Sequence, residues 1–352
     1  MTRNLKGFVF LGFFLFALSS CSSVGSNNVN RAFYYWKTKH ITDYEAQMFR
    51  ECNAQKLYIK IFEVAVDEVL GVQPVSKANI HLSSQMLKES KIVPCIFIEN
   101  DAIASSTNEQ LDELAENTVF LTNRYIDFKL KDNESDTLNC SEIQIDCDWM
   151  ASSRDQYFYF LKALRNHTDK EISCTLRLYP YKFRTEMGVP PVNRVMLLCY
   201  NLLNPRAEEN KNSILDLVEL EKYIHTDSDY PLPVDVTLPC YSSCYVFNNA
   251  QFQEVHHGVP QGLEGICLPS EDGLWYVVKQ DTSVEHNYYR QGQRLRIERV
   301  GRSLLLEATN LVLENIELQK GATVGLYHLD ENEIKQYNDE TLDSVYMLFD
   351  QR

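Results

Sequence analysis

The stretch Glu142-Ile143-Gln144-Ile145-Asp146-Cys147-Asp148-Trp149 alternates polar and apolar residues without interruption. A period of two is typical of a β-strand, because successive side chains point to opposite faces. Along such a strand Asp146 and Asp148 lie about 6.6 Å apart on one face. An amphipathic helical pattern follows at once, as in a βαβ unit. We therefore expect the polar face to look into a barrel and the apolar face to meet outer helices.

The rest of the chain repeats this order of strand and helix. Strands are expected at residues 33–36, 56–62, 92–99, 142–149, 172–179, 194–200, 234–239 and 323–328. Helical patterns fall at residues 44–52, 108–128, 155–166, 214–224, 303–313 and 340–349. Eight strands, mostly with helices between them, predict an α/β fold of the (β/α)8 barrel type. The alternative, an open doubly wound sheet, is less favoured because no Gly-rich phosphate turn follows a strand.

One region near the C-terminus breaks this order. Residues 275–279 and 294–298 are two strand-like runs with Asn287 and Gly292 between them. They predict an inserted β-hairpin at about 272–300, at the rim of the barrel. The expected organisation is a signal at residues 1–20, a tether at 21–30 and a single barrel at 31–352 that carries this insertion.

The N-terminus has the features of an export signal. Arg3 and Lys6 precede an apolar run at residues 8–18, which is short for a membrane span. Leu18-Ser19-Ser20-Cys21 resembles the lipobox of bacterial lipoproteins, in which Cys21 would be acylated after cleavage. The alternative is an ordinary secretory signal. The resemblance implies a lipid anchor in the cell envelope, with the outer membrane as the expected membrane and its face left open.

Charge and cysteine content restrict the possible partners. The formal charge is −15, and loss of the signal with Arg3 and Lys6 makes it −17, which disfavours nucleic acid as a partner. No finger-like spacing of cysteine or histidine indicates a zinc site, and we expect neither metal nor cofactor. Cys240 and Cys244 are spaced for a tight disulfide, or are two free thiols.

The expected strands place several polar side chains on one face. If these faces point inward, Lys60, Asp146, Asp148 and Arg177 meet inside the barrel and neutralise one another. One interpretation is a purely structural layer of salt bridges, to which Lys60 and Glu142 fit best. The other is a ligand site, because active sites of this fold lie at the carboxyl ends of the strands. Further candidates at strand ends are Tyr179 and Tyr200.

The run Ile145-Asp146-Cys147-Asp148-Trp149-Met150 resembles the fourth-strand signature Asp-x-Asp-x-Glu of the chitinase-like, family 18 glycoside hydrolases. Asp146 and Asp148 match the two aspartates, and Trp149 fills the place before the glutamate. Met150 stands where the family has this glutamate, its general acid. The run Leu198-Cys199-Tyr200-Asn201 is similar to the family's Met-x-Tyr-Asp, with Asn201 in place of the aspartate.

This resemblance implies a glycan site formed by Asp146, Asp148, Trp149, Tyr200 and Asn201, with the two aspartates as catalytic candidates. In the family, the second aspartate positions the substrate's acetamido group and the glutamate supplies the proton. A methionine cannot protonate a leaving oxygen. The stretch is also similar to uncharacterised bacterial relatives of these barrels, for which no activity is implied.

Three functions follow from these observations. We expect first an envelope lipoprotein whose barrel binds a glycan, with Lys60, Arg177 and Tyr179 as further ligand-binding residues. The second is an active glycoside hydrolase with a relocated acid, for which Glu63, Asp67, Glu99, Asp101 and Asp330 follow expected strands. The third is a structural or assembly lipoprotein whose partners dock on the inserted hairpin.

Overall fold

The computed structural model describes residues 29–69, 71–80, 82–130, 137–207, 210–226, 228–271, 273–284, 287–337 and 339–351. The expected signal, Cys21 and the tether up to residue 28 lie outside the described residues. No helix within the described ranges combines the length and the apolar character that a membrane span requires.

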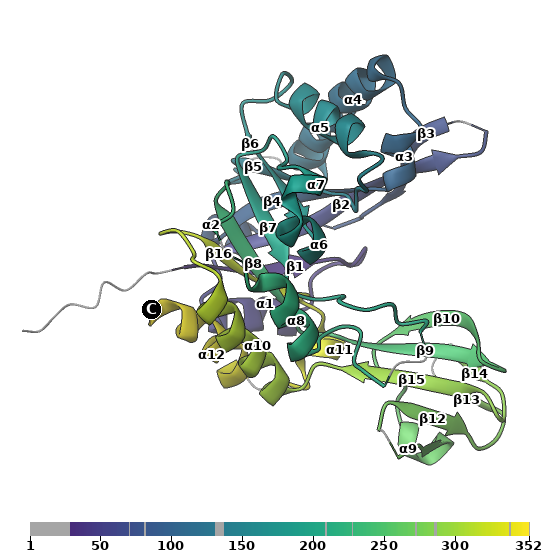
Figure 1. Cartoon of the computed structure of the whole chain (residues 1–352). Coiled ribbons are helices and arrows are strands. Elements are labelled where there is room, and N and C mark those ends of the chain that lie inside the picture. Colours follow the sequence, from purple (N-terminus) through teal and green to yellow (C-terminus); the bar gives the residue numbers. More distant parts are fainter. Residues whose placement is uncertain are drawn as a thin grey trace, which may run out of the picture.

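Eight parallel strands form a closed barrel, which confirms the predicted fold (Figure 1). They are β1 (Asn30–Tyr35), β2 (Lys56–Asp67), β4 (Lys91–Ile98), β5 (Glu142–Asp146), β6 (Glu171–Leu176), β7 (Arg194–Leu198), β8 (Val234–Pro239) and β16 (Thr323–Tyr327). The order is β1-β16-β8-β7-β6-β5-β4-β2, and pairing of β1 with β2 closes the ring. An antiparallel strand, β3 (Gly71–Lys77), extends β2 outside the ring and was not expected.

Helices cover the outside of the barrel (Figure 1). They are α1 (Asp43–Glu51), α2 (Ser84–Glu89), α3 (Asn100–Ala104), α4 (Asn108–Phe128), α5 (Arg154–Leu164), α6 (Leu178–Lys182), α7 (Arg184–Met187), α8 (Leu217–Ile224), α10 (Arg302–Asn315), α11 (Glu331–Ile334) and α12 (Asp339–Asp350). The longest, α4, begins where Thr107 and Gln110 form a reciprocal capping box. The apolar stripe of α4 packs on the sheet and against α5, as the alternation in β5 requires.

The insertion is larger than the predicted hairpin at 272–300. It begins at Ser242 and forms a five-stranded antiparallel sheet in the order β10-β9-β15-β12-β11, which projects from the barrel in Figure 1. Its elements are β9 (Ser242–Asn248), β10 (Gln251–His257), α9 (Leu263–Ile266), β11 (Cys267–Pro269), β12 (Trp275–Val278), β13 (Thr282–Val284), β14 (Asn287–Tyr289) and β15 (Arg294–Arg299). Ser242 pairs with Arg299, so the chain leaves and re-enters the barrel at neighbouring points. Cys240 and Cys244, at its base, are both buried free thiols.

The inward direction of the polar face of β5 is confirmed by its contacts. Gln144 accepts a 2.6 Å hydrogen bond from the hydroxyl of Tyr34 across the barrel. Deeper in the barrel, Glu142 accepts a 2.6 Å hydrogen bond from Ser173 on β6 and lies 3.1 Å from Nζ of Lys56 on β2. The cation that pairs with Glu142 is Lys56, a residue that was not among the predicted inward-facing charges.

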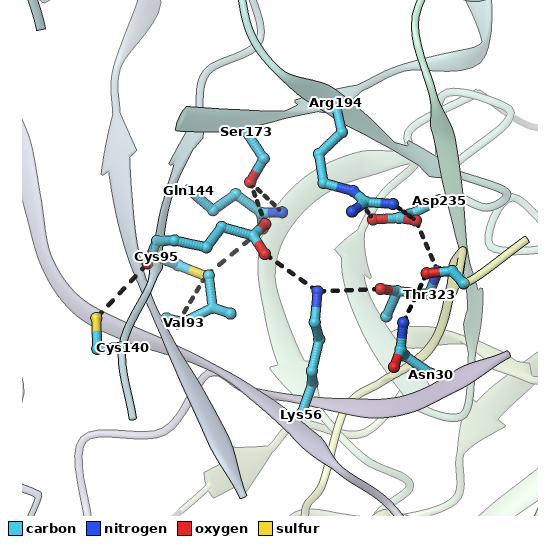
Figure 2. Close-up of polar contacts among 12 residues, drawn as sticks. Asn30, Lys56, Val93, Cys95, Cys140, Gln144, Ser173, Arg194, Asp235 and Thr323 are labelled. Carbon is cyan, nitrogen blue, oxygen red and sulfur yellow. Dashed lines mark hydrogen bonds and ion pairs between the residues drawn. The ribbon is translucent and has the colours of Figure 1, made fainter. Parts of the chain in front are cut away.

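A second ion pair completes this network at the amino-terminal end of the barrel (Figure 2). Arg194 donates through Nε and Nη2 to the two oxygens of Asp235, at 2.7 and 2.8 Å. The amide of Thr323 donates to the same carboxylate, and its hydroxyl lies 3.2 Å from Lys56 Nζ. Six strands thus contribute to one set of buried, paired charges, which suits a structural role because burial of an unpaired ion costs several kcal/mol.

Candidate functional site

Half-exposed polar and aromatic side chains gather at the opposite, carboxyl-terminal end of the barrel. We call this region the mouth and define it by six residues, Trp36, Lys60, Asp146, Asp148, Arg177 and Tyr327. Trp36, Asp146, Asp148, Arg177 and Tyr327 lie at or just past the end of a barrel strand, whereas Lys60 lies within β2, one residue past its last pairing with β1. Active sites in this fold are built from such positions, because the loops that follow the strands leave them open to solvent.

Asp148 and Arg177 form an ion pair with two hydrogen bonds. Nε and Nη2 of Arg177 donate to the two carboxylate oxygens at 2.6 and 2.8 Å. The side chains are 51% and 33% exposed, because β5 ends at Asp146 and β6 at Leu176. Burial works to lower the pKa of Arg177, but the hydrogen bonds and the charge of Asp148 raise it above its usual value. Arg177 therefore stays charged, and among the described residues its Nη1 has no hydrogen-bond partner, which leaves two N–H groups for a ligand.

Asp146 differs from Asp148 because no cation of the described ranges lies within ion-pair distance of it. Thr175 donates a 2.6 Å hydrogen bond to Oδ1, and in the described part of the chain the hydrogen bonds of Asp146 involve this oxygen alone. Burial and the neighbouring charge of Asp148 raise the pKa of Asp146 to about 6, against the opposing effects of Thr175, Arg177 and Lys60. Oδ2 is left as an acceptor, or as a proton donor at acidic pH.

Lys60 lies at the edge of the mouth. Its Nζ is 3.1 Å from Glu63, three residues further along β2, and 5.6 Å from the centre of the Trp36 ring. The sequence predicted that Lys60 would neutralise Asp146 and Asp148. This prediction is wrong for direct contact, because Lys60 pairs with Glu63. Its charge still acts at longer range, because it lowers the pKa of Asp146.

Aromatic rings form the floor of the mouth. Tyr327 stacks on Tyr200 with ring centres 5.3 Å apart and lies 5.9 Å from Trp36. Tyr241 packs edge-on against Tyr327, and its hydroxyl donates to Asn201 at 2.6 Å. Tyr200 and Tyr241 are buried, whereas Trp36 and Tyr327 keep part of their surface exposed. Sequence reasoning missed Trp36, Tyr241 and Tyr327, although Tyr327 ends β16 and the other two closely follow β1 and β8.

Two of the predicted ligand-binding residues lie outside the mouth. Trp149 is 4% exposed and stacks on Tyr157 of α5 at 5.1 Å, on the apolar side of β5. Tyr179 belongs to helix α6 and not to a strand end, because β6 stops at Leu176. Its ring packs on Phe183, 4.6 Å away. Neither aromatic ring is therefore brought to the floor formed by Tyr327.

The residue in the place of the family's general acid and the five carboxylates proposed to replace it lie at the following positions. Met150 is exposed in the turn that follows Trp149, where its amide binds the Ser153 hydroxyl. The five substitutes lie on β2, at the start of α3 and at the start of α11, and are Glu63, Asp67, Glu99, Asp101 and Asp330. Glu63 contacts the mouth through Lys60, whereas Asp330 caps α11. Among the residues that the structure describes, no three His, Cys, Asp or Glu side chains group as metal ligands.

Comparison with known proteins gives a likeness of fold. No protein-family model matches the sequence, and no curated protein matches it significantly. Solved structures with a similar course include a chitinase from Bacteroides thetaiotaomicron, at 13% identity and a TM-score of 0.49, over 91% of this chain and 96% of that one. The spore cortex-lytic enzyme SleL of Bacillus cereus is 12% identical, with a TM-score of 0.48, over 89% and 73%. At such low identity we judge function from the residues of this chain.

Proposed function

We propose that the protein is an envelope lipoprotein whose barrel binds a glycan at the mouth, without a catalytic acid after β5. The observation that carries this proposal is the combination of free hydrogen-bonding atoms with exposed ring surface. Among the described residues, Oδ2 of Asp146 and Nη1 of Arg177 have no hydrogen-bond partner. Tyr327 is close enough for both charges to act on it, and Trp36 packs 5.9 Å from Tyr327.

Sugars match this combination chemically. Their hydroxyl groups donate to carboxylates and accept from guanidinium groups, and the C–H face of the ring packs on aromatic side chains. Because Arg177 already holds Asp148 by two bonds, the mouth is preorganised and little side-chain entropy is lost on binding.

Hydrolysis needs a proton donor and a second carboxyl group on the two sides of the scissile bond. Met150 supplies no proton, and both oxygens of Asp148 accept hydrogen bonds from Arg177. A hydrolase in which Asp146 donates the proton is the second candidate, because the pKa of Asp146 is raised to about 6. In that case turnover would fall as the pH rises above 6.

The lipid anchor is part of the same proposal. Seven residues separate Cys21 from Val29, a tether that spans at most about 28 Å. The chain enters β1 at Asn30, on the barrel end opposite the mouth. Acylation at Cys21 would therefore hold the barrel close to the membrane with the mouth turned away from it. Labelling with a palmitate analogue tests the anchor, and the label should be lost in Cys21→Ala.

The decisive experiment uses residues 22–352 and a panel of chito-oligosaccharides, peptidoglycan fragments and plant glycans. We expect calorimetric binding of one class and no new reducing ends. Asp148→Asn should weaken this binding about tenfold or more, because Arg177 loses its fixed position and a charge-assisted bond is removed. Turnover that disappears in Asp146→Asn would favour the hydrolase. Absence of binding to the whole panel would favour the structural or assembly lipoprotein.

A further inference from the structure

A buried carboxyl group lies where the inserted sheet joins the barrel. Glu333, on α11, is 4% exposed. The hydroxyl of Ser242, the first residue of β9, donates to Glu333 Oε2 at 2.7 Å. Glu333 Oε1 lies against Gly258, where an added Cβ would be 3.4 Å away. Gly258 follows β10, and its amide donates to the Ser242 carbonyl at 3.0 Å. One carboxyl group thus contacts both ends of the β9–β10 hairpin.

Glu333 has no ion-pair partner in the part of the chain that the structure describes. The titratable groups that face this junction are Asp330 on α11, His328 after β16, His257 at the end of β10, Cys240 after β8 and Tyr337 after α11. Burial lowers the pKa of His328 to about 4, so this imidazole is neutral. The nearest lysine, Lys37, is taken up by Glu45 and Asp330.

The physical consequence is a carboxyl group that resists ionisation. Burial raises the pKa of Glu333 to about 7, and the negative Asp330 adds to this, against the hydrogen bonds from Ser242. When the group ionises, the charge has no counter-ion and can be solvated only if the hairpin base separates from α11.

We propose that Glu333 is a pH-dependent latch, which holds the base of the inserted sheet on the barrel while it is neutral and releases it when it ionises. The latch acts near the mouth, because Ser242, which contacts Glu333, directly follows Tyr241, and Tyr241 packs on Tyr327 of the mouth. Opening at Ser242 displaces Tyr241 from Tyr327 and from Asn201. This inference concerns the hinge alone and holds whether or not the mouth binds a glycan.

Amide hydrogen exchange measures the opening of the latch and needs no ligand. The probe is the Gly258 amide, which is bonded to Ser242, and the reference is the Cys199 amide, which is bonded to Thr237 inside the barrel wall. A raised carboxyl pKa in the closed state means that closure is strongest at acidic pH and weakens as the pH rises through about 7. The equilibrium constant for opening at the Gly258 amide, obtained after correction for intrinsic exchange, should be at least about tenfold greater at pH 8 than at pH 5. The same constant at the Cys199 amide should not change in this way.

Variants separate the latch from other titrations. Glu333→Gln keeps the shape and the bond to Ser242 and should make opening independent of pH. Asp330→Asn still caps α11 and should reduce the pH dependence without abolishing it. Glu331→Gln, on the same helix but paired with Lys335 at the surface, is the matched control and should behave as the wild type. The proposal is overturned if Glu333→Gln keeps the full pH dependence, or if His257→Gln removes it.

Discussion

The two ends of the barrel hold the same kind of ion pair in different environments. At the amino-terminal end Lys56 and Glu142 have side chains only 8% and 5% exposed and lie 3.1 Å apart. At the mouth, Arg177 and Asp148 approach even more closely, to 2.6 Å, but remain 33% and 51% exposed. Distance alone therefore does not separate a structural pair from a binding pair.

The difference lies in the hydrogen bonds that each pair leaves unused. Both oxygens of Glu142 are occupied, by Ser173 and Lys56. At the mouth, the Arg177 side chain is 33% exposed and its Nη1 has no hydrogen-bond partner among the residues that the structure describes. A buried pair with every atom satisfied can only stabilise the fold, whereas an exposed pair with spare donors costs little and can bind.

The largest effect is expected from breaking the buried pair. Glu142→Ala leaves the Lys56 ammonium buried without a counter-charge, which should lower the free energy of unfolding by about 3–5 kcal/mol. Urea denaturation followed by circular dichroism measures this. The matched control is Asp155→Ala, whose pair with Arg154 is at the surface and should contribute far less to the free energy of unfolding than the buried pair does. Equal effects of the two variants would remove the distinction between the two ends.

A smaller effect should follow the titration of Asp146. Since its pKa rises from 3.8 unfolded to about 6 folded, its stabilisation is complete below pH 3.8 and is lost as the pH rises through 6. The difference in unfolding free energy between Asp146→Asn and the wild type should shift by roughly 1–2 kcal/mol over this interval, allowing for screening at the half-exposed mouth. Thermal unfolding between pH 4 and pH 7 measures it. A constant difference would mean that Asp146 is solvated like a surface carboxylate.

The smallest effect is expected at Tyr179. Its ring lies on α6 and is 44% exposed, so Tyr179→Ala should change the affinity for a bound glycan by less than about twofold. Calorimetry with the ligand used for Asp148→Asn provides the test. A tenfold loss would extend the binding surface beyond the mouth to α6.

Local patterns predicted the fold because alternation in a strand reports burial directly. The inward direction of Glu142, Gln144 and Asp146 follows from parity and is confirmed by their contacts. Asp148 lies two residues past the end of β5 and still meets Arg177, as parity predicted. Parity fails at Tyr179, because β6 ends at Leu176, earlier than the alternating residues do. A strand end depends on the loop and helix that follow, and hydrophobic alternation does not encode it.

Pairing across the barrel was not predictable from the sequence. Lys56 and Lys60 share the same parity on β2, and the tilt and register of the strands decide which of them meets Glu142. The inserted sheet was underestimated for a similar reason. β9 pairs with β15, although about 45 residues lie between them, and such long-range pairing leaves no local signal. Glu333 likewise becomes notable only after the fold brings Ser242 and Gly258 beside it.

Ser242 and Arg299, the first and last residues of the inserted sheet, are paired neighbours. The inserted sheet is therefore a cassette, meaning a segment that can be removed or exchanged as a unit. The chain departs and returns at adjacent residues, and the sheet has a core of its own that includes Cys244, Val246 and Leu295. A segment of this kind can be exchanged for a short turn without rethreading any barrel strand. The barrel and the sheet are therefore free to diverge at different rates, and grafting the cassette between related barrels is a practical way to transfer whatever the sheet contributes.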